Sequence, residues 1–172
     1  MTSASDPLTL VLVGPMAAGK TSVGRRVARR LGVAFIDTDK RIVAAHGPIP
    51  DIFAAHGEAH FRELERTAVA DALAEGGVIS LGGGAVTQAA TRELLRQQPV
   101  VFLTVSPDAV ADRLRGGSRP LLAGEDPVER WKKIFEERRG WYTEVSSATF
   151  DTSRRPMQKI ADEIVTWRRE QR

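Results

Sequence analysis

The chain has 172 residues, and its 25 basic and 22 acidic side chains leave a net charge of +3. This length suits one domain with a sizeable core, and the absence of cysteine excludes disulfide bonds and thiolate metal sites. No apolar run approaches the ~18 residues of a membrane span, and residues 1–7 lack the features of a secretory signal. We therefore expect a cytoplasmic protein that does not associate with membranes.

Short apolar runs alternate with segments of helical periodicity, the pattern of an α/β fold with a parallel sheet. The predicted strands are 8–13, 34–36, 78–81, 100–105 and 149–151. The predicted helices are 21–31, 40–45, 58–75, 90–97, 107–114, 127–139 and 157–169. Residues 46–53 are expected to form a turn and a short apolar piece, and residues 114–126 a mobile lid around an arginine. We find no repeat or linker, so a single domain is expected over residues 1–172.

The basic residues do not form the cluster on one face that nucleic-acid binding requires. The densest group consists of Arg25, Arg26, Arg29 and Arg30 on one predicted helix. Such a group is typical of a solvated helix face. We therefore expect no nucleic-acid partner.

Residues 14–21 read GPMAAGKT and match the phosphate-binding loop pattern G-x-x-x-x-G-K-[ST] at every fixed position. A predicted strand leads in and a predicted helix leads out, so backbone N–H groups and the helix N-terminus converge on one point. Lys20 can reach the outer phosphates there, and the Thr21 hydroxyl can ligate Mg²⁺. The segment predicts binding of a nucleoside triphosphate.

Charged side chains follow the second predicted strand and also occur in the long third predicted helix. Asp37 and Asp39 stand at a carboxyl end of the sheet, where ligands bind in open α/β folds. Asp37 can hold Mg²⁺ through water or, alternatively, cap the next helix. Arg62 precedes Glu65 by three residues, so the carboxylate can orient the guanidinium; a plain surface ion pair is the alternative.

Glycines and two further arginines complete the candidate residues. Gly82, Gly83 and Gly84 follow the third strand, where they allow either close approach to a ligand or a tight turn. Arg119 in the predicted lid can neutralise charge on a transferring phosphoryl group. Arg138 can bind an anion, although an arginine at the predicted helix end also suits the helix dipole with no ligand.

In this order, the motifs resemble the shikimate kinase family from about residue 8 to the C-terminal helix. The shared segments are GPMAAGKT at 14–21, DTD at 37–39, DIF at 51–53, GE at 57–58, FR at 61–62, LGGGAV at 81–86 and RPLL at 119–122, with Arg138 before Tyr142. This chain has Gly140 where the family usually has proline. The resemblance implies a P-loop, nucleoside-monophosphate-kinase-like three-layer sandwich with a five-stranded parallel sheet. It places a substrate-binding subregion at about 39–66.

The resemblance also implies a reaction. The family transfers the γ-phosphate of ATP to the 3-hydroxyl of shikimate, giving shikimate 3-phosphate and ADP on the route to chorismate and the aromatic amino acids. Mg²⁺ is the implied cofactor, and a monomer without an obligate protein partner is expected. Two guanidinium groups beside a carboxylate suit shikimate, a small polyol with one carboxylate group.

The resemblance assigns roles to individual residues. The catalytic residues are Lys20, Asp39 and Arg119. The ATP-binding residues are Gly14, Ala17, Ala18, Gly19, Lys20, Thr21, Ser22, Arg113, Arg119 and Arg155. The acceptor-binding residues are Asp39, Arg62, Gly82, Gly83 and Arg138, while Thr21 ligates Mg²⁺ and Asp37 supports it through water. Whether Asp39 removes a proton or only positions the hydroxyl stays open, because a loose transition state asks little of a base.

Two alternatives remain. One is a related kinase for gluconate or another cyclitol or hydroxy acid, although residues 81–84 and 119–122 favour shikimate. The other is a catalytically silent nucleotide-binding module. The presence of Lys20, Asp39 and Arg119 argues against a silent module.

Overall fold

The computed structural model describes residues 8–115 and 126–171. Five parallel strands form one sheet in the order β2-β3-β1-β4-β5. The strands are β1 Thr9–Val13, β2 Phe35–Asp37, β3 Gly77–Ser80, β4 Val100–Thr104 and β5 Ala148–Asp151. The helices are α1 Lys20–Leu31, α2 Thr38–His46, α3 Ile49–His56, α4 Glu58–Glu75, the 3₁₀ turn η1 Ala85–Thr87, α5 Ala89–Leu95, α6 Pro107–Arg115, α7 Pro127–Val145 and α8 Met157–Glu170.

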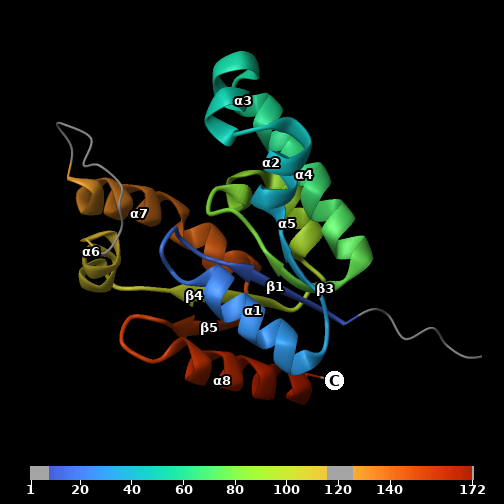
Figure 1. The fold of residues 1–172 in the computed structure, drawn as a ribbon, viewed down its shortest axis with the longest axis vertical. Helices are drawn as coiled ribbons and strands as arrows, with labels where there is room; N and C mark the ends of the chain where they lie inside the picture. Colours follow the sequence, from blue (N-terminus) through green and yellow to red (C-terminus); the bar gives the residue numbers. More distant parts are fainter. Residues whose placement is uncertain (1–7, 116–125, 172) are drawn as a thin grey trace, which may run out of the picture.

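Helices cover both faces of the sheet (Figure 1). Successive strand residues point to opposite faces, so Leu10 and Leu12 of β1 pack under α1 and α8, while Val11 and Val13 pack under α4, α5 and α7. The inner strand β1 is therefore apolar at nearly every position, as expected for a parallel sheet buried on both sides. The expected three-layer α/β sandwich with a five-stranded parallel sheet is confirmed.

Helices α2 and α3 and the first part of α4 form a further small hydrophobic cluster at the top of Figure 1. Its core consists of Ile42, Ile52 and Phe61, and the Phe53 ring lies 5.0 Å from the Phe61 ring. The prediction of a turn and an apolar piece at 46–53 is wrong from Ile49 onward, where α3 begins, and only residues 47–48 form the connection from α2. Proline at position 50 is compatible with a helix there, since a first-turn residue has no intrahelical partner for its N–H.

Helix α7 extends further than predicted. The expected end at Arg139 is wrong: the helix continues through Gly140 to Val145. Burial of Tyr142, which is 1% exposed, outweighs the ~1 kcal/mol that an interior glycine costs a helix. Arg138 therefore lies inside the helix, and the interpretation that it merely stabilises the last turn does not hold.

The predicted lid at 114–126 lies mostly outside the described residues, and Arg119 lies wholly outside them. Of its described ends, Leu114 belongs to α6, and Asp126 caps α7 by accepting a hydrogen bond from the Val128 N–H at 3.0 Å. In the described part of the chain, no helix combines the length and apolarity needed to cross a membrane.

Candidate active site

The phosphate loop joins β1 to α1, and its two fixed glycines are required by its geometry. Gly14 has φ +150° and a Cβ there would overlap the Leu103 carbonyl oxygen of β4. Gly19 has φ +90°, and its Cβ would lie 2.8 Å from the Met157 side chain of α8. A side chain at either position would both strain the backbone and force neighbours apart.

Side chains from distant elements hold the outer side of the loop. The Trp131 indole donates to the Met16 carbonyl at 2.8 Å, and the Thr152 hydroxyl donates to the Ala18 carbonyl at 2.7 Å. Arg113 donates to the Ala17 carbonyl at 2.6 Å and also to the Thr152 carbonyl. Because a trans peptide points its N–H opposite its carbonyl, these anchors turn the N–H groups that follow Met16, Ala17 and Ala18 away from the anchoring side chains.

The two arginines predicted to bind the nucleotide differ in their surroundings. Arg113 lies against the loop, as described above, whereas Arg155 donates to Glu163 of α8 at 2.5 Å on the surface. Ser22 lies in the first turn of α1, where its hydroxyl accepts a 2.5 Å hydrogen bond from Arg26. The structure thus brings Arg113 to the loop and engages Arg155 elsewhere.

Lys20 links the loop to the carboxylates after β2. Its Nζ donates to the Gly14 carbonyl at 2.7 Å and the Pro15 carbonyl at 2.9 Å. Burial lowers the pKa of Lys20 to about 8, and the nearby carboxylates Asp39 and Asp37 act in the opposite direction. A cation held at this point lies where the outer phosphates of a bound nucleotide would be.

Asp37 and Asp39 stand at the start of α2 but do different things. Asp37 is the N-cap, and its Oδ1 accepts from the Lys40 N–H at 3.2 Å, so the capping interpretation is confirmed for this residue. Asp39 Oδ1 is buried and has no hydrogen-bond partner among the described residues. Burial, and then the charge of Asp37, raises the pKa of Asp39, while Lys20 and Arg62 oppose the shift. Asp39 is therefore a carboxylate with free acceptor capacity.

Arg62 and Glu65 of α4 form a buried ion pair. Their atoms Nη1 and Oε1 lie 2.7 Å apart, and their side chains are only 10% and 2% exposed. Glu58 lies 3.4 Å from the other guanidinium nitrogen, Nη2. Burial raises the pKa of Glu65, while its hydrogen bond to Arg62 lowers it. The alternative of a plain surface pair is wrong: Glu65 orients a guanidinium inside the molecule.

The glycine turn after β3 makes room for these two side chains. A Cβ on Gly82 would lie 2.7 Å from both Asp39 carboxylate oxygens, and a Cβ on Gly84 would lie 2.5 Å from Arg62 Nη2. Glycine is therefore required because the turn packs under the Asp39 carboxylate and the Arg62 guanidinium. Between them, the Gly83 carbonyl accepts a 2.5 Å hydrogen bond from the Tyr142 hydroxyl.

Arg138 lies on α7 one turn before Tyr142 and points its charge toward the same region. Its charge opposes the burial-raised pKa values of Tyr142 and Glu65, and it contributes to the lowered pKa of Lys20. No salt bridge between described residues involves Arg138, whereas its neighbour Arg139 pairs with Glu136. Arg138 thus offers a guanidinium that forms a hydrogen bond with Tyr142 but has no described carboxylate in salt-bridge contact.

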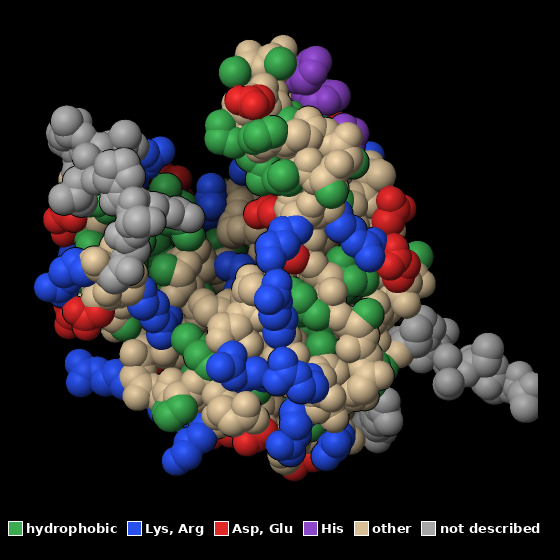
Figure 2. Space-filling model, viewed as in Figure 1, with side chains coloured by type: hydrophobic (Ala, Val, Ile, Leu, Met, Phe, Trp, Pro, Cys, Tyr) green, Lys and Arg blue, Asp and Glu red, His purple; other side chains and the backbone are tan. Residues whose placement is uncertain are grey.

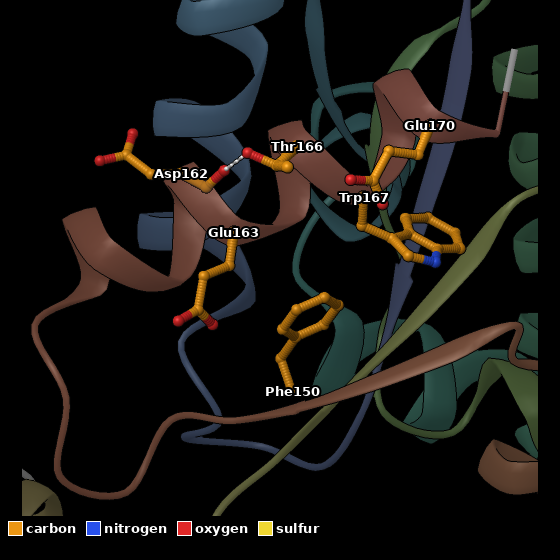
Figure 3. Close-up of a pocket in the computed structure, with 6 residues that line it drawn as sticks. All are labelled: Phe150, Asp162, Glu163, Thr166, Trp167 and Glu170. Atoms are coloured by element: carbon orange, nitrogen blue, oxygen red, sulfur yellow. Dashed lines mark hydrogen bonds between the residues drawn. The ribbon is translucent and has the colours of Figure 1, made fainter.

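The space-filling view in Figure 2 is hollowed between the α2–α4 cluster and the α6–α7 side, with basic and acidic side chains on the wall of the hollow. A second hollow of about 470 Å³ lies between β5 and α8 (Figure 3). Phe150, Asp162, Glu163, Thr166, Trp167 and Glu170 line it. Asp162 and Glu163 are already paired with Arg30 and Arg155, and this hollow shares no residue with the site above.

The fold and the site define a P-loop phosphotransferase, and two guanidinium groups, Arg62 and Arg138, and the Asp39 carboxylate lie in one electrostatic cluster with its Lys20. A family model described as shikimate kinase matches residues 16–169. The shikimate kinase of Corynebacterium efficiens is 45% identical over 158 residues, which cover 91% of this chain and 94% of that protein. The chain belongs to the shikimate kinase family.

Solved structures agree with this membership. Shikimate kinase from Acinetobacter baumannii in complex with shikimate aligns with a TM-score of 0.86 and 35% identity, covering 96% of this chain and 95% of the other. A gluconokinase from Sinorhizobium meliloti aligns with a TM-score of 0.66 and 22% identity, covering 96% and 94%. The second likeness shows a common fold alone.

Proposed function

We propose that this chain transfers the γ-phosphate of ATP to the 3-hydroxyl of shikimate, giving shikimate 3-phosphate and ADP for chorismate and aromatic amino-acid biosynthesis. One observation carries the proposal: the free Asp39 Oδ1 lies in the same electrostatic cluster as Lys20 and Arg62. A carboxylate that can accept a hydrogen bond from a substrate hydroxyl, Asp39, thus lies near both the Lys20 cation of the donor loop and the Arg62 guanidinium, which can bind a carboxylate. The solved relative with shikimate bound supports this choice of acceptor.

On the acceptor side, Arg62 and Arg138 bind the carboxylate of shikimate, because planar guanidinium groups recognise carboxylates through paired hydrogen bonds. Asp39 accepts hydrogen bonds from the substrate hydroxyls, and its raised pKa makes it a stronger base than an ordinary aspartate. Gly82 and Gly83 bring the backbone close to the substrate. These residues come from α2, α4, α7 and the turn after β3.

On the donor side, the backbone of residues 14–19 and the start of α1 hold the phosphates, with Ser22 beside them. Arg113 contributes to adenine binding, as does Arg155 once it leaves Glu163. Lys20 and Arg119, the latter outside the described residues, stabilise the charge that develops on the transferring phosphoryl group. Their role is electrostatic, since phosphoryl transfer needs little covalent chemistry from the protein.

The residues present fit a magnesium ion that enters with ATP. Thr21 offers a hydroxyl in the first turn of α1, and the capping bond of Asp37 uses only Oδ1. Within the described residues, no group of three or more His, Cys, Asp or Glu gathers as a protein cage for a metal. Mg²⁺ commonly takes one or two protein oxygens together with phosphates and water, and it would neutralise phosphate charge.

We further propose that the enzyme acts as a cytoplasmic monomer with no obligate protein partner. The proposed organisation is a single kinase domain over 1–172, with the substrate-binding subregion at about 39–66 and a lid at about 114–126.

The test is a coupled ADP-release assay over shikimate, gluconate and a set of cyclitols, with an acceptor-free reaction as the background. We expect shikimate to give the highest kcat/KM. Turnover of gluconate or a cyclitol without turnover of shikimate would replace the proposed acceptor. Tight ATP binding without any phosphorylated product would instead identify a silent nucleotide-binding module.

A further inference from the structure

The buried hydroxyl of Tyr142 meets the glycine turn beside the acceptor site. Tyr142 is 1% exposed, and its ring stacks on Phe102 of β4 with centroids 5.2 Å apart. The Phe135 ring, two turns earlier on α7, lies 6.4 Å away. Since the ring is held by these aromatic neighbours, its hydroxyl has a fixed position from which it donates to the Gly83 carbonyl at 2.5 Å.

This hydrogen bond restrains the glycine turn from a distant part of the chain. The Gly82 carbonyl accepts from the Ala85 N–H at 3.1 Å, and the Gly84 carbonyl accepts from Thr87, so both bonds stay within the turn itself. The Gly83 carbonyl, by contrast, is fixed by a side chain 59 residues away. The Gly83 N–H donates to no described group, which leaves it free for a ligand.

The same side chain ties the turn to Arg138. Residues four apart on a helix lie on one face, so Arg138 and Tyr142 project from α7 in the same direction. The other end of the turn, Gly84, packs under the Arg62 guanidinium. The charges of Arg138 and Arg62 both act on the Tyr142 hydroxyl, and Arg138 also forms a hydrogen bond with it. Burial raises its pKa to about 12, so it stays a hydrogen-bond donor through the neutral range.

We propose that Tyr142 is a positioning residue for the acceptor: its hydroxyl fixes the Gly83 peptide so that the glycine turn and Arg138 meet the acceptor carboxylate in one geometry. The identity of the acceptor rests on the proposed function, but the role of Tyr142 does not depend on which hydroxy acid is used. Removing the hydroxyl should therefore weaken acceptor use specifically and leave the donor loop unaffected.

The experiment compares Tyr142→Phe with Thr143→Val. The first keeps the stacked ring and removes only the hydroxyl. The control removes a hydroxyl from the next residue of α7, which is exposed and donates to the Arg139 carbonyl at 3.0 Å. We expect Tyr142→Phe to raise the acceptor KM about tenfold, the usual scale for one well-placed hydrogen bond, with the ATP KM changed less than about twofold. The control should leave both constants unchanged.

A rescue variant separates positioning from general loss of structure. Replacing Tyr142 with 4-aminophenylalanine restores a donor at the same place and should recover most of the acceptor KM. An unchanged acceptor KM in Tyr142→Phe would overturn the proposal, as would equal rises in both KM values or a failure of the rescue. If the wild-type enzyme phosphorylates a different acceptor from the panel, the proposed function fails and the same comparison is made with that acceptor.

Discussion

The proposed donor side of the site is one continuous loop, whereas the proposed acceptor side is assembled from three helices and a glycine turn. Residues 14–21 follow one another in the chain, and their carbonyls are anchored from outside by Trp131, Arg113 and Thr152. The acceptor residues come from α2, α4 and α7 and from the turn after β3. The two halves meet at Lys20, because the charges of both Asp39 and Arg138 act on its pKa.

This difference has a functional consequence. The donor half presents backbone N–H groups, which substitutions other than those at Gly14 and Gly19 leave in place. The acceptor half presents charged side chains that are oriented by other side chains, such as Glu65 behind Arg62. Single substitutions should therefore separate acceptor binding from donor binding, except at Lys20.

The largest effect is expected from Lys20→Met. Loss of the cation should lower kcat by about 10²–10³-fold, the scale on which one preorganised electrostatic contact acts in a transition state. Lys40→Met, at an exposed position of α2, is the matched control and should keep wild-type turnover. ADP release at saturating substrates measures the effect. A loss of less than tenfold would show that the donor loop functions without its lysine.

Arg62→Ala should weaken acceptor binding without affecting ATP binding. We expect the shikimate KM to rise about 10²-fold, because a charge-assisted pair of hydrogen bonds is lost, while the ATP KM stays within about twofold. Glu65 would be left buried without its partner, so unfolding free energy should also fall by about 3 kcal/mol. Both quantities can be measured at a temperature where the variant is folded.

The control for Arg62→Ala is Arg66→Ala on the same helix. Arg66 pairs with Glu63 at 2.8 Å, but both side chains are exposed, so its loss should change stability by less than about 1 kcal/mol. It should leave both KM values unchanged. Equal rises of the shikimate and ATP constants in Arg62→Ala would contradict the division into two halves.

The pH dependence of ATP use should report on Lys20. Since burial lowers its pKa from 10.5 to about 8, the free enzyme loses this cation as the pH rises through 8. The kcat/KM for ATP should then fall by about tenfold for each further pH unit, because kcat/KM reflects the free enzyme. Bound phosphates favour the protonated amine, so kcat at saturating ATP should fall at a higher pH. Coincident profiles would contradict this assignment.

The effect of Lys20 on stability has the opposite sign. Between pH 8 and 10.5 the unfolded chain binds more protons at this residue than the folded chain does, so its contribution to unfolding free energy rises with pH. As the pH rises through this range, deprotonation of Lys20 should thus lower kcat/KM for ATP while its contribution to unfolding free energy rises. Urea unfolding of the wild type and Lys20→Met at pH 8 and pH 9.5 measures this difference.

The sequence predicted the sheet well because its inner strands are continuous apolar runs bounded by glycine or charge. It failed at α3 and at the end of α7, where tertiary contacts decide the outcome. Ile52 and Phe53 stabilise α3 by packing on Phe61, and the burial of Tyr142 carries α7 past Gly140. Gly140 argued against a helix and burial outweighed it, whereas proline at position 50 lies in the first turn of α3, where it is tolerated.

The site shows the same division. The donor loop could be predicted because its residues are contiguous and its glycines are fixed by backbone geometry. The burial of the Arg62–Glu65 pair could not be inferred from a three-residue spacing that exposed pairs share, such as Glu63 and Arg66. Tyr142 was missed because a lone tyrosine resembles a core residue. Its position four residues after Arg138 was the one local signal that both project into the same space.

Gly140→Ala tests whether the acceptor half depends on the continuity of α7. Nothing lies within 4 Å of a Cβ at this position, and its backbone is helical, so alanine should raise unfolding free energy by about 0.5–1 kcal/mol. Gly32→Ala at the end of α1 is the contrast: its surroundings are equally open, but its φ of +68° should make alanine destabilising by about 1 kcal/mol. Urea unfolding measures both. Gly140 lies between Arg138 and Tyr142, so a stiffer helical turn should leave the shikimate KM unchanged or lower it. A higher KM would mean that the acceptor half requires a flexible helix at this point.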